Sequence, residues 1–205
     1  MAPNRLVALA SRNQGKLAEL RRLLTELPWR LVSVDECPGG RDVAWDESGA
    51  SYRENAVIKA VAVHTATGLP ALADDSGLEL DAFDGWPGVQ TARWMGDGFT
   101  SEQLLEALAA KVARLPVGQR GATFRCVLAY LDPLRSRDPL FVEGVVRGTL
   151  LGSPRGLGGF GYDPIFVPEG HDRTMAELAE GEKASLSHRG RAAQELVRSL
   201  TVRSD

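Results

Sequence analysis

Hydrophobic residues form strand-like runs and helix-like repeats in alternation along the first part of the chain. Residues 6–10 are a short apolar run, as expected of a buried strand. Leucines then recur at helical spacing through residues 17–27 until Pro28 interrupts the pattern. Residues 31–34 have the pattern of a second strand. Residues 35–49 are rich in Gly, Pro and acidic side chains, which is typical of a loop.

The middle of the chain continues the alternation. Ser51 and Glu54 fit a capping box, which predicts a helix that runs to about Thr65. Residues 71–73 form a short apolar strand that we expect to end at the acidic pair that follows. Several glycines and prolines between residues 78 and 98 indicate irregular strands and turns.

The second half predicts more strands and fewer helices. Its expected elements are a helix capped by Thr100, β-rich segments at 124–131 and 140–149, a glycine-dense loop at 152–161, a short helix after Thr174 and a last helix from about His188 to Leu200. The two β-rich segments could pair antiparallel. The whole pattern predicts an α/β fold with a mixed sheet, and the 205 residues suit one domain or two closely packed lobes.

Composition narrows the class of function only slightly. The chain carries 24 basic and 27 acidic side chains, a balance that gives no general attraction to nucleic acid or acidic membranes. Only four of the basic residues are lysines, and three of them, Lys16, Lys59 and Lys183, lie in segments that matter below. The two cysteines lack metal-type spacing. Without a signal-peptide run at residues 1–5 or a membrane-length apolar stretch, we expect a cytoplasmic protein.

The first segment with chemical potential lies between the first strand and the first helix. A helix N-terminus after a strand offers free N–H groups and partial positive charge, which suit a phosphate. Ser11 and Asn13 can add hydrogen bonds, and Lys16 can reach an oxygen. The segment lacks the glycine and the Lys-Ser/Thr pair of a Walker A loop. A capped helix with a surface lysine is the competing interpretation.

The second segment places Asp74 and Asp75 at the end of the apolar strand. Two adjacent carboxylates in a partly dry place are expected to raise each other's pKa, and a divalent cation would relieve this. Carboxylate oxygens suit Mg²⁺, which keeps several waters and shares substrate phosphates. Further carboxylates are available from Asp46, Glu47 and Glu54. An acidic turn in which Asp75 only caps the next residues is the alternative.

Two further segments could recognise a nucleobase. Residues 158–164 combine glycines, which permit close approach, with Phe160 and Tyr162, which could stack on a base, and Asp163, which could read its edge. The same aromatic residues could instead fill the core. Lys183, followed by His188 and Arg189 at the start of the last helix, could bind phosphate or oxo groups; a histidine there could also be purely structural.

Taken in order, these segments resemble the Ham1/RdgB-type family of inosine-triphosphate pyrophosphatases. The matching motifs are Ser11-x-Asn13-x-x-Lys16-x-x-Glu19, Glu47-x-Gly49 with Glu54-Asn55-Ala56 and Lys59-Ala60, Ala73-Asp74-Asp75-Ser76-Gly77-Leu78, Pro87-Gly88-Val89 with Ala92-Arg93, Gly159-Phe160-Gly161-Tyr162-Asp163-Pro164, and Ser187-His188-Arg189-Gly190. Each motif is weak alone, but the ordered set is specific. The sequence departs from the family at Ser51-Tyr52, where a Thr-Phe pair is usual, and at Thr91, where Ser is usual.

The resemblance implies an elongated mixed sheet with flanking helices, two lobes around a central cleft, a homodimer, and Mg²⁺-dependent hydrolysis of inosine and xanthosine triphosphates to the monophosphate and pyrophosphate. It implies that Glu47 and Asp75 bind the metal, and that Asp75 is the proton acceptor, with Asp74 and Lys59 in the catalytic group. The implied substrate-binding residues are Ser11, Arg12, Asn13, Gln14, Gly15, Lys16, Ser76, Phe160, Gly161, Tyr162, Asp163, Lys183, His188 and Arg189.

Two other classes of function compete with this interpretation. A Maf-like nucleotide pyrophosphatase would act on other nucleotides, including modified pyrimidines, and the Ser187-His188-Arg189 segment argues against it. A nucleotide sensor would bind without turnover, and it has no need of a water-activating Asp75. A triphosphate panel separates the first alternative, and pyrophosphate release with and without Mg²⁺ separates the second.

Overall fold

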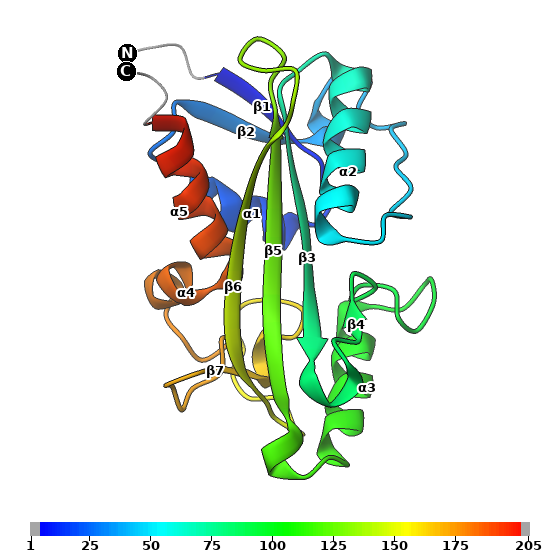
Figure 1. The fold of residues 1–205 in the computed structure, drawn as a ribbon, viewed down its shortest axis with the longest axis vertical. Coiled ribbons are helices and arrows are strands. Elements are labelled where there is room, and N and C mark those ends of the chain that lie inside the picture. The colour runs from blue at the N-terminus through cyan, green and yellow to red at the C-terminus, as the bar shows by residue number, and fades with distance from the viewer. Residues whose placement is uncertain (1–4, 202–205) are drawn as a thin grey trace. The chain divides into compact units, whose positions relative to one another are not determined.

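The computed structural model describes residues 5–201 as a seven-stranded sheet with α- and 3₁₀-helices (Figure 1). The strands are β1 (Arg5–Leu9), β2 (Trp29–Ser33), β3 (Ala71–Leu80), β4 (Pro87–Gly88), β5 (Gly121–Leu131), β6 (Leu140–Leu150) and β7 (Phe166–Pro168). The α-helices are α1 (Gln14–Leu23), α2 (Tyr52–Thr67), α3 (Ser101–Ala113), α4 (Glu180–Leu186) and α5 (His188–Thr201), and the 3₁₀-helices are η1 (Val34–Glu36), η2 (Asp81–Phe83), η3 (Val117–Gln119) and η4 (Asp163–Ile165).

The sheet order is β2-β1-β3-β5-β6-β7, with β4 paired to β3. β1 runs parallel to β2 and β3, whereas β4 is antiparallel to β3 and β7 is antiparallel to β6. The predicted mixed α/β class is therefore confirmed. Within residues 5–201, no helix has both the length and the apolar character needed to cross a membrane. The N-terminal residues 1–4, where the sequence lacks a signal-peptide pattern, lie outside the described residues.

The chain divides into two compact units. The first contains the residues up to Asp75, residues 126–144 and the residues from Arg191 onward; the second contains residues 76–125 and 145–190. One boundary between the units falls at the peptide bond between Asp75 and Ser76, within β3. The cleft and lobes that the resemblance implies remain predictions.

The first unit has a core built from helix leucines against strand residues. The buried cluster joins Leu17 and Leu20 of α1 and Leu196 of α5 to Val7 and Leu9 of β1, all at most 3% exposed. The helical spacing of these leucines is what turns one face of each helix inward. β1 pairs Leu9 with Leu72 of β3, so the segment that follows β1 lies level with the acidic pair of β3.

The second unit has its own apolar core. Leu104, Leu108 and Val112 of α3 pack against Leu78 and Leu80 of β3, in a cluster that also contains residues of β5, β6 and β7. The helix begins as predicted, with a capping box between Thr100 and Gln103. Each unit therefore buries a separate set of apolar side chains.

One strand prediction is wrong in a way that affects the site. β3 does not end at Asp74 but continues to Leu80, so both carboxylates lie in mid-strand. Leu78 and Leu80 are buried, and Leu78 pairs with Gly88 of β4, which extends the strand beyond the acidic pair. β1 ends at this level, so the carboxylates lie beside the end of a neighbouring strand rather than at the end of their own.

Candidate active site

An ammonium group joins the two predicted metal ligands in the first unit. Lys59, on the inner face of α2, donates to Oδ1 of Asp75 at 2.6 Å, to Oε1 of Glu47 at 3.0 Å and to the backbone oxygen of Asp74 at 2.8 Å. These bonds use all three N–H donors of a lysine. Lys59 is only 4% exposed, so the loop carrying Glu47 and the strand carrying Asp75 meet at a buried cation.

Burial dominates the electrostatics of Asp75. Loss of water raises the pKa of its carboxyl group, the positive charges of Lys59 and Lys16 act in the opposite direction, and Glu47 raises it further, with a raised pKa as the net result. For Lys59, burial lowers the pKa, but Asp75 and Glu47 outweigh burial, so the pKa is raised. Lys59 is therefore charged at neutral pH.

Asp74 has a different set of partners from Asp75. Neighbouring strand residues point to opposite faces of a sheet. Accordingly, the carboxylate of Asp74 accepts a bond from Lys16 of α1 at 2.5 Å, and Cys126 of β5 lies 3.4 Å from its Oδ2. The two neighbouring carboxylates therefore each face an ammonium group, Lys16 at Asp74 and Lys59 at Asp75, and burial is the first cause of the raised pKa of Asp75.

The segment between β1 and α1 contains the helix cap that one of the two interpretations predicted. Asn13 is the N-cap of α1, since its Oδ1 accepts from the backbone N–H of Lys16 at 3.0 Å, and Ser11 Oγ accepts from the N–H of Asn13 at 3.2 Å. Lys16 is not a surface lysine, because its side chain is only 19% exposed and reaches Asp74. Gln14 and Gly15 form the first turn of α1. The side chain of Arg12 points to a neighbouring loop, described below.

Glu47 and Asp75 are a pair of carboxylates rather than a complete metal cage. Within the described residues, no group of three or more His, Cys, Asp or Glu side chains is arranged to hold a metal ion. Mg²⁺ commonly uses one or two protein carboxylates and completes its shell with water and phosphate oxygens. Across the described part of the chain, Oδ2 of Asp75 is buried and finds no hydrogen-bond partner. That oxygen is available to a cation.

In the second unit, Asp163 organises its neighbours. Its Oδ2 accepts from the backbone N–H of Phe160 at 2.8 Å and from Lys183 at 2.7 Å, and the residue is 4% exposed. Lys183 and Arg189 lie over the ring of Phe160, at 5.0 and 5.4 Å from its centroid. Asp163 therefore fixes the position of both the aromatic ring and the ammonium group beside it.

The two aromatic residues of the glycine-rich loop have different environments. Tyr162 is buried in the core of the second unit, where its hydroxyl accepts from Trp94 at 2.8 Å and donates to the backbone oxygen of Thr91 at 2.9 Å. Burial raises the pKa of Tyr162. Phe160, next to Gly161, is only partly buried. The core-filling alternative thus describes Tyr162, whereas Phe160 is partly exposed beside two cations.

Buried contacts also hold the two residues at the start of α5. His188 stacks on Phe124 of β5, with ring centroids 4.6 Å apart and an interplanar angle of 10°. Arg189, which is 2% exposed, donates to Oγ of Ser76 at 3.1 Å. Phe124 had no signal in the sequence, because an aromatic residue within a β-rich run ordinarily indicates core packing.

The start of α5 depends on close packing at Gly190, which gives a test of the fold. A Cβ atom at Gly190 would lie 1.8 Å from the carbonyl oxygen of Ala184. We expect Gly190→Ala to lower the free energy of unfolding by about 1–3 kcal/mol, because backbone must move to admit the methyl group. Urea unfolding measures this. Gly181→Ala is the matched control, since a Cβ there meets nothing within 4 Å and should be neutral or stabilising. Equal effects of the two changes would contradict the packing.

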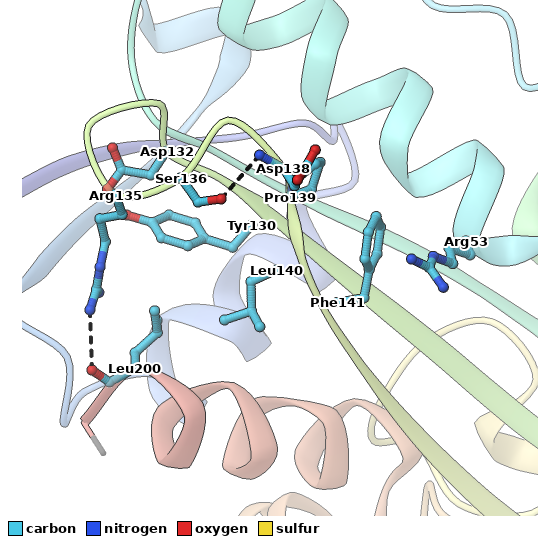
Figure 2. A pocket seen from close by; sticks show the side chains of 10 residues that line it. All are labelled: Arg53, Tyr130, Asp132, Arg135, Ser136, Asp138, Pro139, Leu140, Phe141 and Leu200. Atoms are coloured by element: carbon cyan, nitrogen blue, oxygen red, sulfur yellow. Dashed lines mark hydrogen bonds between the residues drawn. The ribbon is translucent and has the colours of Figure 1, made fainter. Parts of the chain in front are cut away.

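A pocket of about 670 Å³ in the first unit contains none of the predicted site residues (Figure 2). Three of its charged groups have partners within the chain. Asp132 accepts from Arg5 and from Tyr130, and Arg135 donates to the backbone oxygen of Leu200. The guanidinium of Arg53 lies over Phe141. The candidate functional residues therefore lie outside this pocket, around Lys59 and around Asp163. Cys37 and Cys126 are both buried thiols.

The contacts around Lys59 in the first unit and those around Asp163 in the second involve residues that carried the sequence resemblance, and a comparison with protein families bears on this resemblance. The model of the Ham1 family matches residues 7–199. The chain belongs to the Ham1 family. Its fold agrees with solved members, including a HAM1 protein from Coxiella burnetii with 39% identity and a TM-score of 0.82, which covers 96% of this chain and 98% of the other.

Curated Ham1 relatives give the family a biochemical context. A dITP/XTP pyrophosphatase from Streptomyces coelicolor is 47% identical over 191 residues, which is 92% of this chain and 94% of the relative. One from Escherichia coli O157:H7 is 42% identical and covers 95% of this chain and 97% of its own. A crystal structure of a nucleoside-triphosphatase, or dITP/XTP pyrophosphatase, from Mycobacterium abscessus is 43% identical with a TM-score of 0.72, covering 93% of this chain and 98% of the other.

Proposed function

We propose that this Ham1-family chain hydrolyses non-standard purine nucleoside triphosphates, namely dITP, ITP and XTP, to the nucleoside monophosphate and pyrophosphate. The observation that carries the proposal is the meeting of Glu47, Asp75 and the backbone of Asp74 at Lys59, with Lys16 bound to Asp74. A catalyst of phosphoryl transfer needs positive charge to hold the phosphates and a carboxylate to orient or deprotonate water. The names of the relatives support the substrate class.

We propose Mg²⁺ as the cofactor, held by Glu47 and Asp75. Their carboxylates converge on one ammonium group, and the buried Oδ2 of Asp75 lacks a partner among the described residues. When bound, the ion supplies positive charge against the triphosphate. Asp75 accepts the proton of the attacking water. Ser11, Asn13 and Lys16, with Gln14 and Gly15 in the first helical turn, hold the phosphates, and Asp74 orients Lys16.

The second unit supplies the groups suited to the base. Phe160 offers a ring for stacking, while Lys183 and Arg189 beside it, together with His188, can donate to oxo groups. A site that donates to the 6-oxo group disfavours the 6-amino group of adenine, because buried polar groups would be left unpaired. Crowding near C2 would disfavour the 2-amino group of guanine. We assign Gly161, Tyr162 and Asp163 to shaping this surface and Ser76 to holding Arg189.

Pyrophosphate release from a nucleotide panel tests the proposal. We expect kcat/KM for dITP and XTP to exceed that for dATP and dGTP by at least about 100-fold. Addition of EDTA should abolish turnover, and Mg²⁺ should restore it. Turnover centred on modified pyrimidines would favour the Maf-like alternative, and tight binding without pyrophosphate release would favour a sensor; either result would overturn the proposal.

The base-recognition assignment has its own test. His188→Ala and Arg189→Ala should each raise the KM for ITP about tenfold, which corresponds to one lost hydrogen bond to a buried partner, and should narrow the preference over GTP. Steady-state kinetics on both nucleotides measure this. Arg198→Ala is the control, because Arg198 lies on the same helix but pairs at the surface with Glu195. Unchanged selectivity in the first two variants would refute their role.

The family resemblance also leads us to propose an oligomeric state and a cellular location for the protein. We infer that the protein is a homodimer, which sedimentation velocity of the purified chain measures directly. We also infer that it acts in the cytoplasm, where a nucleotide pool is available to it.

A further inference from the structure

The segment that carries Glu47 has little regular structure of its own. Residues 41–50 lie outside the helices and strands, between η1 and α2. A backbone without ladder hydrogen bonds must obtain its fixed position from other contacts. Lys59 holds the Glu47 carboxylate at 3.0 Å, but this contact fixes the end of a side chain and not the backbone.

The C-terminal end of this segment is fixed to the first turn of α2. The N–H of Gly49 donates to Oδ1 of Asn55 at 2.9 Å, and the N–H of Ala50 donates to Oε2 of Glu54 at 2.7 Å. A Cβ at Gly49 would lie 2.7 Å from Asn55 Oδ1, so only glycine allows this approach. Glu54 thus binds the residue before the N-cap Ser51 rather than completing the predicted capping box.

The N-terminal end of the segment is held by Arg12. One guanidinium nitrogen of Arg12 donates to the backbone oxygens of Val43 at 2.8 Å and Arg41 at 3.1 Å, and its Nε donates to Asp35 at 3.0 Å. The guanidinium also lies 4.9 Å from the ring centroid of Trp45. The ion pair with Asp35 is about 40% exposed and contributes little by itself. The bonds to backbone oxygens are what fix the loop.

We propose that Arg12 is a positioning residue that holds the loop of Glu47 in place and ties it to the phosphate-binding segment, rather than a residue that contacts the nucleotide. Arg12 lies between Ser11 and Asn13, so its backbone belongs to the segment assigned to the phosphates, while its side chain spans to residues 41–45. The proposal rests on the proposed function only in the assignment of Glu47 to the divalent ion. It replaces the sequence-based assignment of Arg12 to substrate binding.

Three measurements on Arg12→Ala test this. In the ligand-free protein, hydrogen exchange of the 41–50 backbone should become at least about tenfold faster, because its anchors are lost. The Mg²⁺ concentration for half-maximal activity should rise about 10-fold to 100-fold, the usual effect of losing a group that supports a metal ligand. The KM for dITP at saturating Mg²⁺ should change less than about threefold.

Matched variants make the result specific. Arg21→Ala is the control, because Arg21 on α1 likewise donates to a backbone oxygen, that of Leu31, and to a carboxylate, that of Glu36. We expect it to leave all three measurements unchanged. Arg12→Lys keeps the charge but loses the planar fork, so its effects should be intermediate.

Two outcomes would overturn the proposal. A raised KM for dITP with unchanged exchange of residues 41–50 would show that Arg12 contacts the nucleotide. Equal behaviour of Arg12→Ala and the wild type in all measurements would show that the loop needs no such anchor. Absence of pyrophosphate release from the wild type would count against the proposed function instead, and the exchange comparison would still decide whether Arg12 holds the loop.

Discussion

Replacing Asp75 with Asn should lower kcat by at least about 1,000-fold, the contribution expected of a positioned proton acceptor. The amide keeps the shape of the carboxylate but can neither accept the proton nor bind a divalent ion as strongly. Lys59 would keep its bonds to Glu47 and to the backbone oxygen of Asp74, so the site should stay assembled. Pyrophosphate release at saturating dITP and Mg²⁺ is the measurement.

The same change should hardly affect stability, and the direction of the pKa shift gives the reason. The pKa of Asp75 is raised in the folded protein, chiefly by burial. When the pKa of an acid is higher in the folded than in the unfolded protein, the folded state disfavours the ionised form of the acid. Such an acid lowers the free energy of unfolding as the pH rises through and above the ordinary pKa of the acid. At neutral pH a neutral amide avoids this penalty. We expect Asp75→Asn to lower Tm by no more than about 4 °C, or about 1 kcal/mol.

Asp132→Asn is the matched control for the loss of activity without loss of stability that we expect of Asp75→Asn. Asp132 is also a buried carboxylate of the first unit, at 3% exposed, but it accepts bonds from Arg5, Tyr130 and the N–H of Leu134. Its replacement should cost about 1–3 kcal/mol of stability by weakening charge-assisted bonds, with kcat unchanged. Loss of activity in Asp132→Asn, or a severe loss of stability in Asp75→Asn, would contradict the division of roles.

Lys59→Met should have the largest effect on stability. Removal of the ammonium group leaves the buried carboxylate of Asp75 without its closest positive charge, and such uncompensated charges cost about 3–5 kcal/mol. The raised pKa of Lys59 points the same way, since it shows that the folded protein favours the charged amine. Activity should be lost as well, because the loop of Glu47 loses a contact with β3. Urea unfolding of the purified variant measures the first effect.

A double-mutant cycle identifies the cause of that loss. If the uncompensated carboxylate is responsible, Lys59→Met combined with Asp75→Asn should recover at least about 1 kcal/mol relative to Lys59→Met alone. Strict additivity of the two changes would mean that Lys59 stabilises the chain through packing of its aliphatic stem, and that the ion pair is not the organising contact.

The sequence was sufficient to predict elements whose signals are local. The predicted capping residues Ser51 and Thr100 begin helices in the structure, and the leucine spacing of the first helix identifies its buried face. The extent of β3 was not predictable in this way. Two acidic residues normally end an apolar strand, and only pairing with β4 and burial of Leu78 carry the strand onward.

Contacts between side chains from distant segments could not be predicted from local sequence patterns either. The resemblance assigned Lys59 to the catalytic group together with the carboxylates. It did not predict the three simultaneous hydrogen bonds of Lys59. Cys126 was dismissed for lack of metal-type spacing, although it lies against Asp74. Phe160 and Tyr162 are chemically similar neighbours, and only the fold separates the ring beside two cations from the ring in the core. The departure at Thr91 retains the hydroxyl, which accepts from the N–H of Leu78 at 2.8 Å.

Phosphorus NMR of the products formed from dITP shows which phosphate bond the protein cleaves. In the presence of Mg²⁺, we expect stoichiometric inorganic pyrophosphate and dIMP, with no orthophosphate, and no reaction for Asp75→Asn under the same conditions. Orthophosphate with dIDP as products, or wild-type turnover in Asp75→Asn, would contradict the assignment of Asp75 to pyrophosphate release.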